Sequence, residues 1–200
     1  MREIFYDWGG LNLLLFHAIN NIRGEFVDGF MQLGSLVGEH TLFPLYLGLV
    51  AVTAMARVAR VPAAEIRNHV MVWLGVVTVF AFCYAIDGPL VSWLKTSLDF
   101  PRPPALLPPE SLHVVGRPEY RHSLPSGHAV FAMTVAASLW PILNRAWRVG
   151  LAVFVLWVGI SRVSLGAHFP ADVLAGYLTG LAVVLVVSFV IRRTMNYFPG

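Results

Sequence analysis

Five long, almost uncharged apolar segments constrain the fold of this chain more than any other feature. They cover residues 41–56, 70–86, 129–143, 149–161 and 173–191. Each can be extended to about 20 residues by including a flanking polar group, which is the length of a transmembrane helix. Hydrophobic residues make up 57% of the chain and charged residues only 12%, a balance that excludes an ordinary soluble domain. The sequence therefore predicts an all-α integral membrane helical bundle of five transmembrane helices.

The segment before these spans has a weaker apolar pattern. Within 11–22, leucine, isoleucine and alanine recur at helical spacing, while His17, Asn12, Asn20 and Asn21 interrupt the pattern. We expect a helix lying at the membrane interface, within an N-terminal interfacial segment 1–30. A sixth transmembrane span over 11–22 is the alternative. Because no internal repeat or linker divides the sequence, one domain over 1–200 is the simplest organisation.

A proline-rich segment separates the second and third predicted spans. Seven prolines fall between residues 100 and 125, which excludes a long helix there and favours an extended or turn-rich chain. We therefore expect residues 95–124 to form an extramembrane loop.

Arginines are concentrated in the loops on one side of the predicted bundle: Arg57, Arg60 and Arg67, then Arg145 and Arg148, then Arg192 and Arg193. The positive-inside rule places these loops in the cytoplasm and the loop 95–124 on the outer face. Lys95 and Arg102 oppose this bias, which a bound anionic ligand would explain. The formal net charge of +3 is not gathered in a basic run or an aromatic-lined face, so nucleic-acid binding is not expected.

Polar residues suited to a phosphate ester form three clusters at the ends of apolar segments. The first cluster consists of Lys95 and Arg102, with Arg102 held between prolines. A guanidinium group can bind two phosphate oxygens at once, and an ammonium group adds a point charge. For Lys95 taken alone, a side chain that reaches to the lipid headgroups is an equally good interpretation.

The second cluster, Ser126, Gly127 and His128, leads directly into the apolar segment 129–143. The free backbone N–H groups and the positive end of a helix dipole bind oxyanions at such a position. Ser126 can add a hydroxyl group, Gly127 lets the backbone approach closely, and His128 is placed to protonate a leaving oxygen. A turn with a helix cap explains Ser126 and Gly127 equally well.

The third cluster combines Arg162 with His168 and Asp172, which are four residues apart. If a helix begins near Pro170, the carboxylate of Asp172 can hold one ring nitrogen of His168 and leave the other free as a nucleophile. A helix-capping aspartate beside an interfacial histidine is the alternative for this pair alone.

The three clusters form one pattern along the chain. The first part is Lys95 followed after six residues by Arg102-Pro103, and the second part is Pro125-Ser126-Gly127-His128. The third part is Ser161-Arg162, followed after five residues by His168 and after three more by Asp172. This pattern resembles the three-part signature of the type 2 phosphatidic acid phosphatase superfamily at every position. The resemblance implies that phosphate is bound by Lys95, Arg102, Ser126, Gly127 and Arg162. It also implies that His168 is the nucleophile, that Asp172 orients it, and that His128 acts first as acid and then as base. A metal-free reaction without a cofactor is part of the same expectation.

The chain is similar to the small bacterial members that act on undecaprenyl diphosphate, phosphatidylglycerophosphate or related lipids. We therefore expect a multi-pass phosphatase of the bacterial inner membrane with its site on the periplasmic face. It would remove the terminal phosphate of a lipid phosphate or diphosphate, first of all undecaprenyl diphosphate, through a phosphohistidine. A phosphatidylglycerophosphate or phosphatidic acid phosphatase, a phosphotransferase that modifies lipid A, and an anionic-lipid transporter are the alternatives. Glu39 and Asp87, close to apolar segments, are the best support for a transporter.

Overall fold

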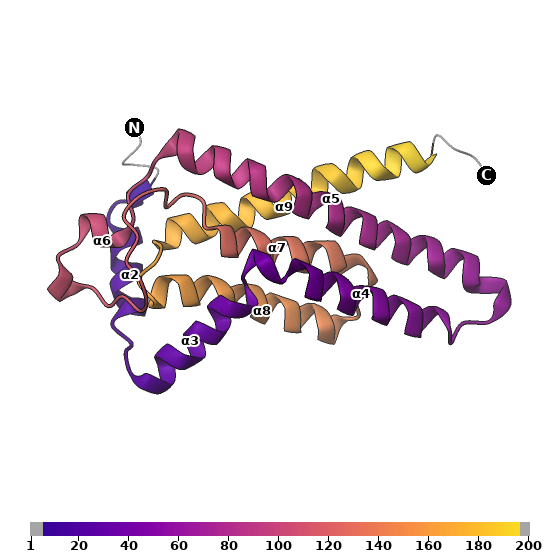
Figure 1. The fold of residues 1–200 in the computed structure, drawn as a ribbon, viewed down its shortest axis with the longest axis horizontal. Coiled ribbons are helices and arrows are strands. Elements are labelled where there is room, and N and C mark those ends of the chain that lie inside the picture. Colours follow the sequence, from indigo (N-terminus) through magenta and orange to yellow (C-terminus); the bar gives the residue numbers. More distant parts are fainter. Residues whose placement is uncertain (1–5, 197–200) are drawn as a thin grey trace.

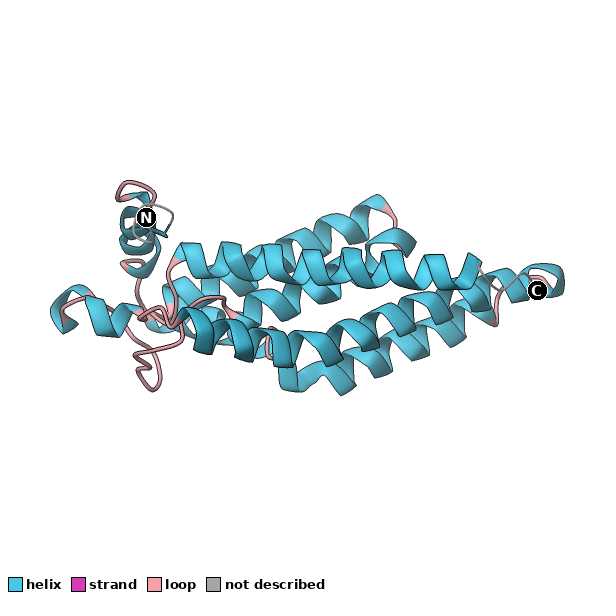
Figure 2. Ribbon diagram, turned by 90° about the horizontal axis from the view of Figure 1, so that it is seen from above, coloured by secondary structure: helices cyan, strands magenta, loops and turns pink. Residues whose placement is uncertain are grey.

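The computed structural model describes residues 6–196, and this part of the chain is helical without any strand (Figures 1 and 2). Its α-helices are α2 (Leu11–Asn20), α3 (Glu25–Val37), α4 (Phe43–Val58), α5 (Ile66–Leu98), α6 (Pro103–Leu106), α7 (Gly127–Leu139), α8 (Arg145–Ser164) and α9 (Pro170–Asn196). Short 3₁₀ helices are η1 (His40–Leu42), η2 (Ala63–Glu65), η3 (Pro109–Ser111) and η4 (Trp140–Ile142).

Four helical segments are long and apolar enough to cross a membrane: His40–Val58, Ala63–Leu106, Arg145–Ser164 and Pro170–Thr194. They contain the first, second, fourth and fifth of the five predicted spans. The third predicted span corresponds to α7, which stops at Leu139 and continues only through η4 to Ile142, so it is too short to count among them. Pro141 in η4 explains this early end, because proline cannot continue the backbone hydrogen bonding of an α-helix.

Helix α7 is the central helix of the bundle. Most of its side chains are buried, including Ala129, Phe131, Thr134 and Val135, and it packs against α5, α8 and α9. A helix that is apolar on all sides is typical of a position enclosed by other helices. The continuous apolar pattern that predicted a transmembrane span over 129–143 therefore reflects burial within protein.

Two glycines allow α9 to lie unusually close to α7. A Cβ atom on Gly176 would come within 2.6 Å of the Ser126 backbone oxygen, and one on Gly180 within 2.6 Å of the Val130 backbone oxygen. These glycines are four residues apart and so lie on one face of α9, as in the small-residue interfaces of membrane helices. The contact fixes the start of α9 beside the start of α7.

Helix α3, which the sequence analysis did not predict, uses the same kind of contact on α8. A Cβ atom on Gly34 would lie 2.8 Å from the Trp157 indole nitrogen, and one on Gly38 would lie 2.4 Å from a Val158 methyl group. The predicted interfacial segment 1–30 therefore extends into a helix that ends at Val37 and packs along the bundle. Phe26, exposed at the start of α3, belongs to its outward face.

The predicted N-terminal helix is present as α2, and two of the asparagines that interrupt its apolar pattern are buried. Asn12 and Asn20 are 3% and 0% exposed, and they are therefore not residues of a polar outer surface. Asn20 donates to the backbone oxygens of His113 (2.7 Å) and Ser164 (2.9 Å) and accepts from the His113 N–H (2.9 Å). Asn12 accepts from the Ala171 N–H (3.0 Å). Helix α2 thus lies across the end of the bundle where α8 finishes and α9 begins (Figure 1).

The prolines prevent a long helix after residue 100, as predicted, and only α6 and η3 interrupt an extended chain up to α7. The predicted loop boundary at residue 95 is wrong by about one turn, because α5 continues to Leu98. Lys95 consequently extends from the last turn of a rigid membrane helix.

We expect Gly180→Ala to lower the stability of the folded protein by about 1–3 kcal/mol, because the added methyl group must separate α9 from α7. Thermal unfolding of the purified protein in detergent measures this change. Gly75→Ala is the matched control, since this glycine also lies in a helix but has nothing within 4 Å of an added Cβ. Equal stability of the two variants would show that the α7–α9 contact is not tight.

Candidate active site

The residues of the three predicted clusters meet at one end of the bundle, where the loops also gather (Figure 2). Lys95 lies in the last turn of α5, Arg102 directly before α6, and Ser126 to His128 at the start of α7. Arg162 is near the end of α8, and His168 and Asp172 flank the start of α9. All eight predicted residues thus come from helix ends that face the same side.

Backbone hydrogen bonds hold these helix ends together. The Ser126 N–H donates to the Asp172 backbone oxygen at 3.0 Å, which joins the start of α7 to the start of α9. The His168 N–H donates to the Arg162 backbone oxygen at 3.1 Å, which joins the turn before α9 to α8. Arg102 of the first cluster donates to the Ala167 backbone oxygen, next to His168, so the three clusters form a single site.

His168 and Asp172 form a buried pair, 2% and 0% exposed. Nδ1 of His168 lies 3.4 Å from Oδ2 of Asp172, so the ring presents Nε2 away from the carboxylate. Burial lowers the pKa of His168 to about 4, and this effect outweighs the Asp172 carboxylate, which acts in the opposite direction. The imidazole is therefore neutral at pH 7, which is the form that can act as a nucleophile.

Three other donors satisfy the carboxylate of Asp172. The Tyr6 hydroxyl donates to Oδ1 at 2.8 Å, while the Ser123 hydroxyl (2.5 Å) and the Phe169 N–H (2.8 Å) donate to Oδ2. Burial, with the neighbouring carboxylate, raises the pKa of Tyr6 above its usual range, so this phenol stays protonated as a donor. Such a set of donors stabilises an ionised carboxylate inside protein.

Sequence reasoning missed Tyr6 and Ser123. Tyr6 is 166 residues from Asp172 along the chain, and no local pattern connects the two. Its ring packs on Phe100 (centroids 4.5 Å apart) and Phe169 (6.0 Å), which fixes the direction of the hydroxyl group. Ser123 lies three residues before Ser126, and this short distance from the second cluster is the sequence feature that could have identified it as a site residue.

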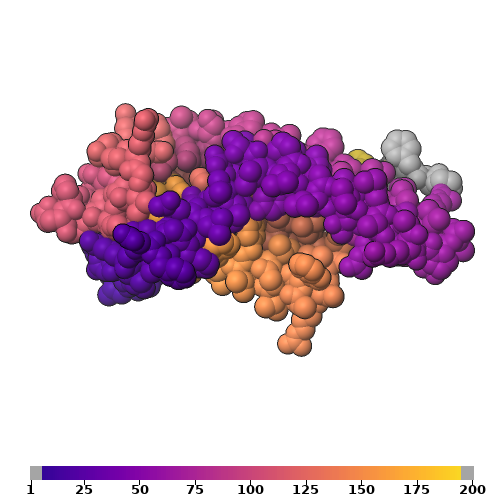
Figure 3. Space-filling model, turned by 60° about the horizontal axis from the view of Figure 1, so that its bottom comes forward, coloured from indigo at the N-terminus to yellow at the C-terminus, as the bar shows by residue number. Residues whose placement is uncertain are grey.

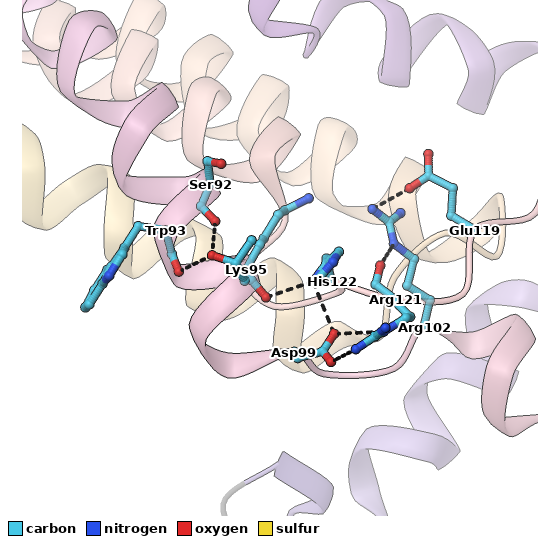
Figure 4. Close-up of polar contacts among 9 residues, drawn as sticks. Ser92, Trp93, Lys95, Asp99, Arg102, Glu119, Arg121 and His122 are labelled. Carbon is cyan, nitrogen blue, oxygen red and sulfur yellow. Dashed lines mark hydrogen bonds and ion pairs between the residues drawn. The ribbon is translucent and has the colours of Figure 1, made fainter.

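Arg102 is buried and its guanidinium is held in one orientation (Figure 4). Nε donates to the Arg121 backbone oxygen at 3.0 Å, and one terminal nitrogen donates to the Ala167 backbone oxygen at 3.4 Å. The other terminal nitrogen lies 2.6 Å from a carboxylate oxygen of Glu119, whose side chain is largely exposed. The two backbone carbonyls therefore orient the guanidinium group of Arg102, and the Glu119 carboxylate pairs with the remaining terminal nitrogen.

A second polar group ties the proline-rich segment to the end of α5. Arg121 pairs with Asp99, and Nδ1 of His122 lies 3.1 Å from Oδ1 of Asp99 (Figure 4). The same His122 nitrogen is 3.0 Å from the Lys95 backbone oxygen. These contacts fix the backbone on either side of Arg102 relative to Lys95.

Among residues 6–196, two buried donors in the site have no hydrogen-bond partner, namely the Ser126 hydroxyl and Nε of Arg162. Another nitrogen of Arg162 bonds to the Ser35 hydroxyl from α3. Leaving buried polar groups unpaired is unfavourable, so donors of this kind indicate a ligand with acceptor atoms. The oxygens of a phosphate bound between the start of α7 and the end of α8 are acceptors of the kind that both donors need.

A cavity of about 310 Å³ runs from the site along α5 and α7, with Lys95 and Gly127 in its lining. Asp87 also lines it and is buried, with Oδ2 accepting from the Thr134 hydroxyl at 2.6 Å. His128, one residue after Gly127, lies within electrostatic reach of Arg162 and His168.

Glu39, the other carboxylate singled out in the sequence, is within electrostatic reach of Arg162. Within residues 6–196, no three His, Cys, Asp or Glu side chains are grouped so that they could hold a metal ion.

Comparison with known proteins gives consistent results. The chain is 27% identical to a lipid A 1-phosphatase of Rhizobium johnstonii over 85% of this chain and 67% of that protein. It is 30% identical to an undecaprenyl-diphosphatase of Sulfolobus acidocaldarius over 86% of this chain and 74% of that protein. The crystal structure of Aquifex aeolicus LpxE superposes with a TM-score of 0.70 at 29% identity, covering 88% of this chain and 94% of that one.

The helical architecture is thus shared with this solved structure, and the candidate site is made of the helix ends that carry the signature. The sequence-family model of the PAP2 superfamily matches residues 73–195, which is more than half of the 200 residues. This chain is therefore a multi-pass membrane lipid phosphatase and belongs to the PAP2 superfamily.

Proposed function

We propose that the chain hydrolyses the terminal phosphate of a membrane lipid phosphate or diphosphate through a phosphohistidine formed on His168. The observation that carries this proposal is the buried, neutral His168 beside Asp172, at the same helix ends as Arg102 and Arg162. A nucleophile next to fixed cations is what phosphoryl transfer requires when most of the catalysis is positioning and charge neutralisation.

In the first step, the lone pair of Nε2 of His168 attacks phosphorus, and the bond from phosphorus to the lipid oxygen breaks. Burial and the neighbouring cations lower the pKa of His128 to about 3, so His128 must take up a proton as the phosphate dianion binds between those cations. It donates this proton to the lipid oxygen, and the lipid leaves as a neutral alcohol or as a lipid phosphate. The imidazole ring gains positive charge in the phosphohistidine, and the carboxylate of Asp172 stabilises that charge.

In the second step, water hydrolyses the phosphohistidine. The deprotonated His128 takes a proton from water, and the water oxygen attacks phosphorus. The bond from phosphorus to Nε2 breaks, inorganic phosphate leaves, and His168 returns to its neutral form.

The anion would be held by the three cationic side chains and by the start of α7. Lys95, Arg102 and Arg162 neutralise the phosphoryl charge, and the two arginines can each present paired donors. The Ser126 hydroxyl and the Gly127 N–H add neutral donors at the positive end of the helix dipole. The unpaired Ser126 hydroxyl and Arg162 Nε support this assignment.

We propose undecaprenyl diphosphate as the first substrate to test, supported by the 30% identity to an undecaprenyl-diphosphatase. Lipid A 1-phosphate is the second candidate, because a lipid A 1-phosphatase matches over 85% of this chain. Release of phosphate from a panel that also holds phosphatidylglycerophosphate and phosphatidic acid separates these candidates by their specificity constants. Phosphate release without a lipid acceptor would argue against a phosphotransferase.

We further propose that the site faces the outside of a bacterial inner membrane. The support is the arrangement of arginines, since Arg57, Arg60, Arg145 and Arg148 lie at the end of the bundle opposite Lys95 and Arg102.

We expect His168→Ala to reduce phosphate release by roughly 10³-fold or more, because no phosphohistidine can form. The variant should fold, since the His168 ring itself donates no hydrogen bond that holds two helices together. His17→Ala, at a histidine of α2 outside the site, should keep full activity. Undiminished release by His168→Ala would disprove the proposed nucleophile.

We expect Asp172→Asn to lower kcat by about 10²-fold or more, because the charge that orients and stabilises the His168 ring is removed. Tyr6→Phe, which removes one donor to the same carboxylate, should have a smaller effect in the same direction. Steady-state kinetics with a short-chain lipid phosphate measures both. A change below twofold for Asp172→Asn would count against its role.

We expect Glu119→Gln to tighten inhibition by inorganic phosphate roughly two- to fivefold, because an anion must displace the Glu119 carboxylate from Arg102. Glu110→Gln is the control, since Glu110 lies in the same proline-rich segment without an ion pair to a described residue. Unchanged or weaker inhibition in Glu119→Gln would show that Glu119 does not compete with the anion.

We expect activity to persist in excess EDTA, because Lys95, Arg102 and Arg162 take the part that metal ions play in other phosphoryl-transfer sites. Phosphate release is measured before and after the chelator is added. Loss of activity that a divalent cation restores would contradict a metal-free reaction.

A further inference from the structure

A large groove lies at the end of the bundle away from the candidate active site. It has a volume of about 880 Å³ and separates the α4–α5 hairpin from α7, η4 and the start of α8. The groove exists because α7 is short, while α4 packs chiefly against α5. Figure 1 shows the hairpin extending well past the ends of α7 and α8, and Figure 3 shows it (purple) projecting beyond α8 (orange).

The lining of this groove is mainly apolar. Tyr46 and Val135 close its inner end, and Leu49, Val72 and Trp147 are lining residues that are 58%, 54% and 62% exposed. At the depth of a bilayer, an apolar hollow between helices is filled by acyl chains, because water is excluded from that region. Trp147, and Trp73 across the groove, are of the type that gathers at the level of the lipid headgroups.

The outer rim of the groove carries positive charge. Arg57 and Arg60, at the end of α4, line it together with Asn68 and His69 from the start of α5. Neither arginine forms an ion pair with a described residue. Glu65, in η2 at the tip of the hairpin, is the nearest acidic residue along the chain and does not line the groove.

We propose that this groove is a binding site for one anionic phospholipid from the leaflet opposite the active site. Its phosphate would lie between Arg57 and Arg60, and an acyl chain would fill the space under Tyr46. The positive charge of the rim attracts the negative headgroup of such a lipid, while the apolar hollow accepts its acyl chain. A zwitterionic lipid has no net charge and is attracted less strongly to the two arginines.

The lipid bound here is distinct from the substrate. Lys95 and Arg60 are at opposite ends of the α4–α5 hairpin, and α5 alone has 33 residues, which corresponds to about 50 Å of helix. That length exceeds the roughly 30 Å of a bilayer core, so the two ends reach different leaflets. The bound lipid fills the space between α4 and α7 that side chains leave open and so supports α4.

The test is the thermal unfolding midpoint of the purified full chain in detergent, titrated with phosphatidylglycerol or phosphatidylcholine of the same acyl chains. We expect phosphatidylglycerol to raise the midpoint at lower concentration than phosphatidylcholine. In Arg57→Gln/Arg60→Gln, roughly tenfold more phosphatidylglycerol should be needed, because both rim charges are lost. Both substitutions are at exposed positions, so the variant is expected to fold.

Two further variants distinguish lipid binding in the groove from a non-specific attraction of anionic lipid to basic residues. Arg192→Gln/Arg193→Gln removes two exposed arginines near the end of α9, outside the groove, and should respond like the wild type. Val72→Trp keeps both rim arginines but fills the hollow, and should weaken the effect of both lipids. Equal stabilisation by the two lipids, an unchanged response of Arg57→Gln/Arg60→Gln, or an unchanged response of Val72→Trp would each overturn the proposal.

Discussion

The close approach of α9 to α7 is the contact on which the candidate active site depends. Because Gly176 and Gly180 have no side chains, the two backbones meet, and the Ser126 N–H can reach the Asp172 backbone oxygen. That bond fixes the start of α7, the proposed anion-binding position, against Asp172 in the first turn of α9 and His168 just before it. In a membrane, where burial of apolar surface drives helix association weakly, close packing of small residues is an effective way to obtain such precision.

Charge in the site is arranged so that few buried groups are left unpaired before an anion arrives. Asp172 is surrounded by donors from Tyr6, Ser123 and Phe169, and Arg102 is held by two backbone carbonyls and by Glu119. The side chains are therefore oriented before the substrate binds, and little rearrangement is needed. Within the described part of the chain, Ser126 and Arg162 each keep one buried donor without a partner, and on the proposed function these donors would bind the phosphate.

The sequence predicted the parts of this molecule that depend on local chemistry. Polar residues such as Lys95, Arg162 and His168 stand out against apolar surroundings, and the prolines after residue 100 exclude a long helix there. What it did not predict depends on contacts between distant segments. Tyr6 reaches Asp172 only because α2 folds across the bundle, and Asn12 and Asn20 look like surface residues until that contact is known. The apolar segment 129–143 is another case, because burial in protein and burial in lipid select the same residue types.

The hydrogen bond between Tyr6 and Asp172 joins two segments that are 166 residues apart along the chain. The donor set around the carboxylate cannot be complete until α9 has been inserted and the N-terminal segment has folded back over it. A nascent chain that stalls before α9 therefore carries Lys95, Arg102 and His128 without the carboxylate of Asp172. On the proposed mechanism, such a chain would not yet hydrolyse a lipid phosphate.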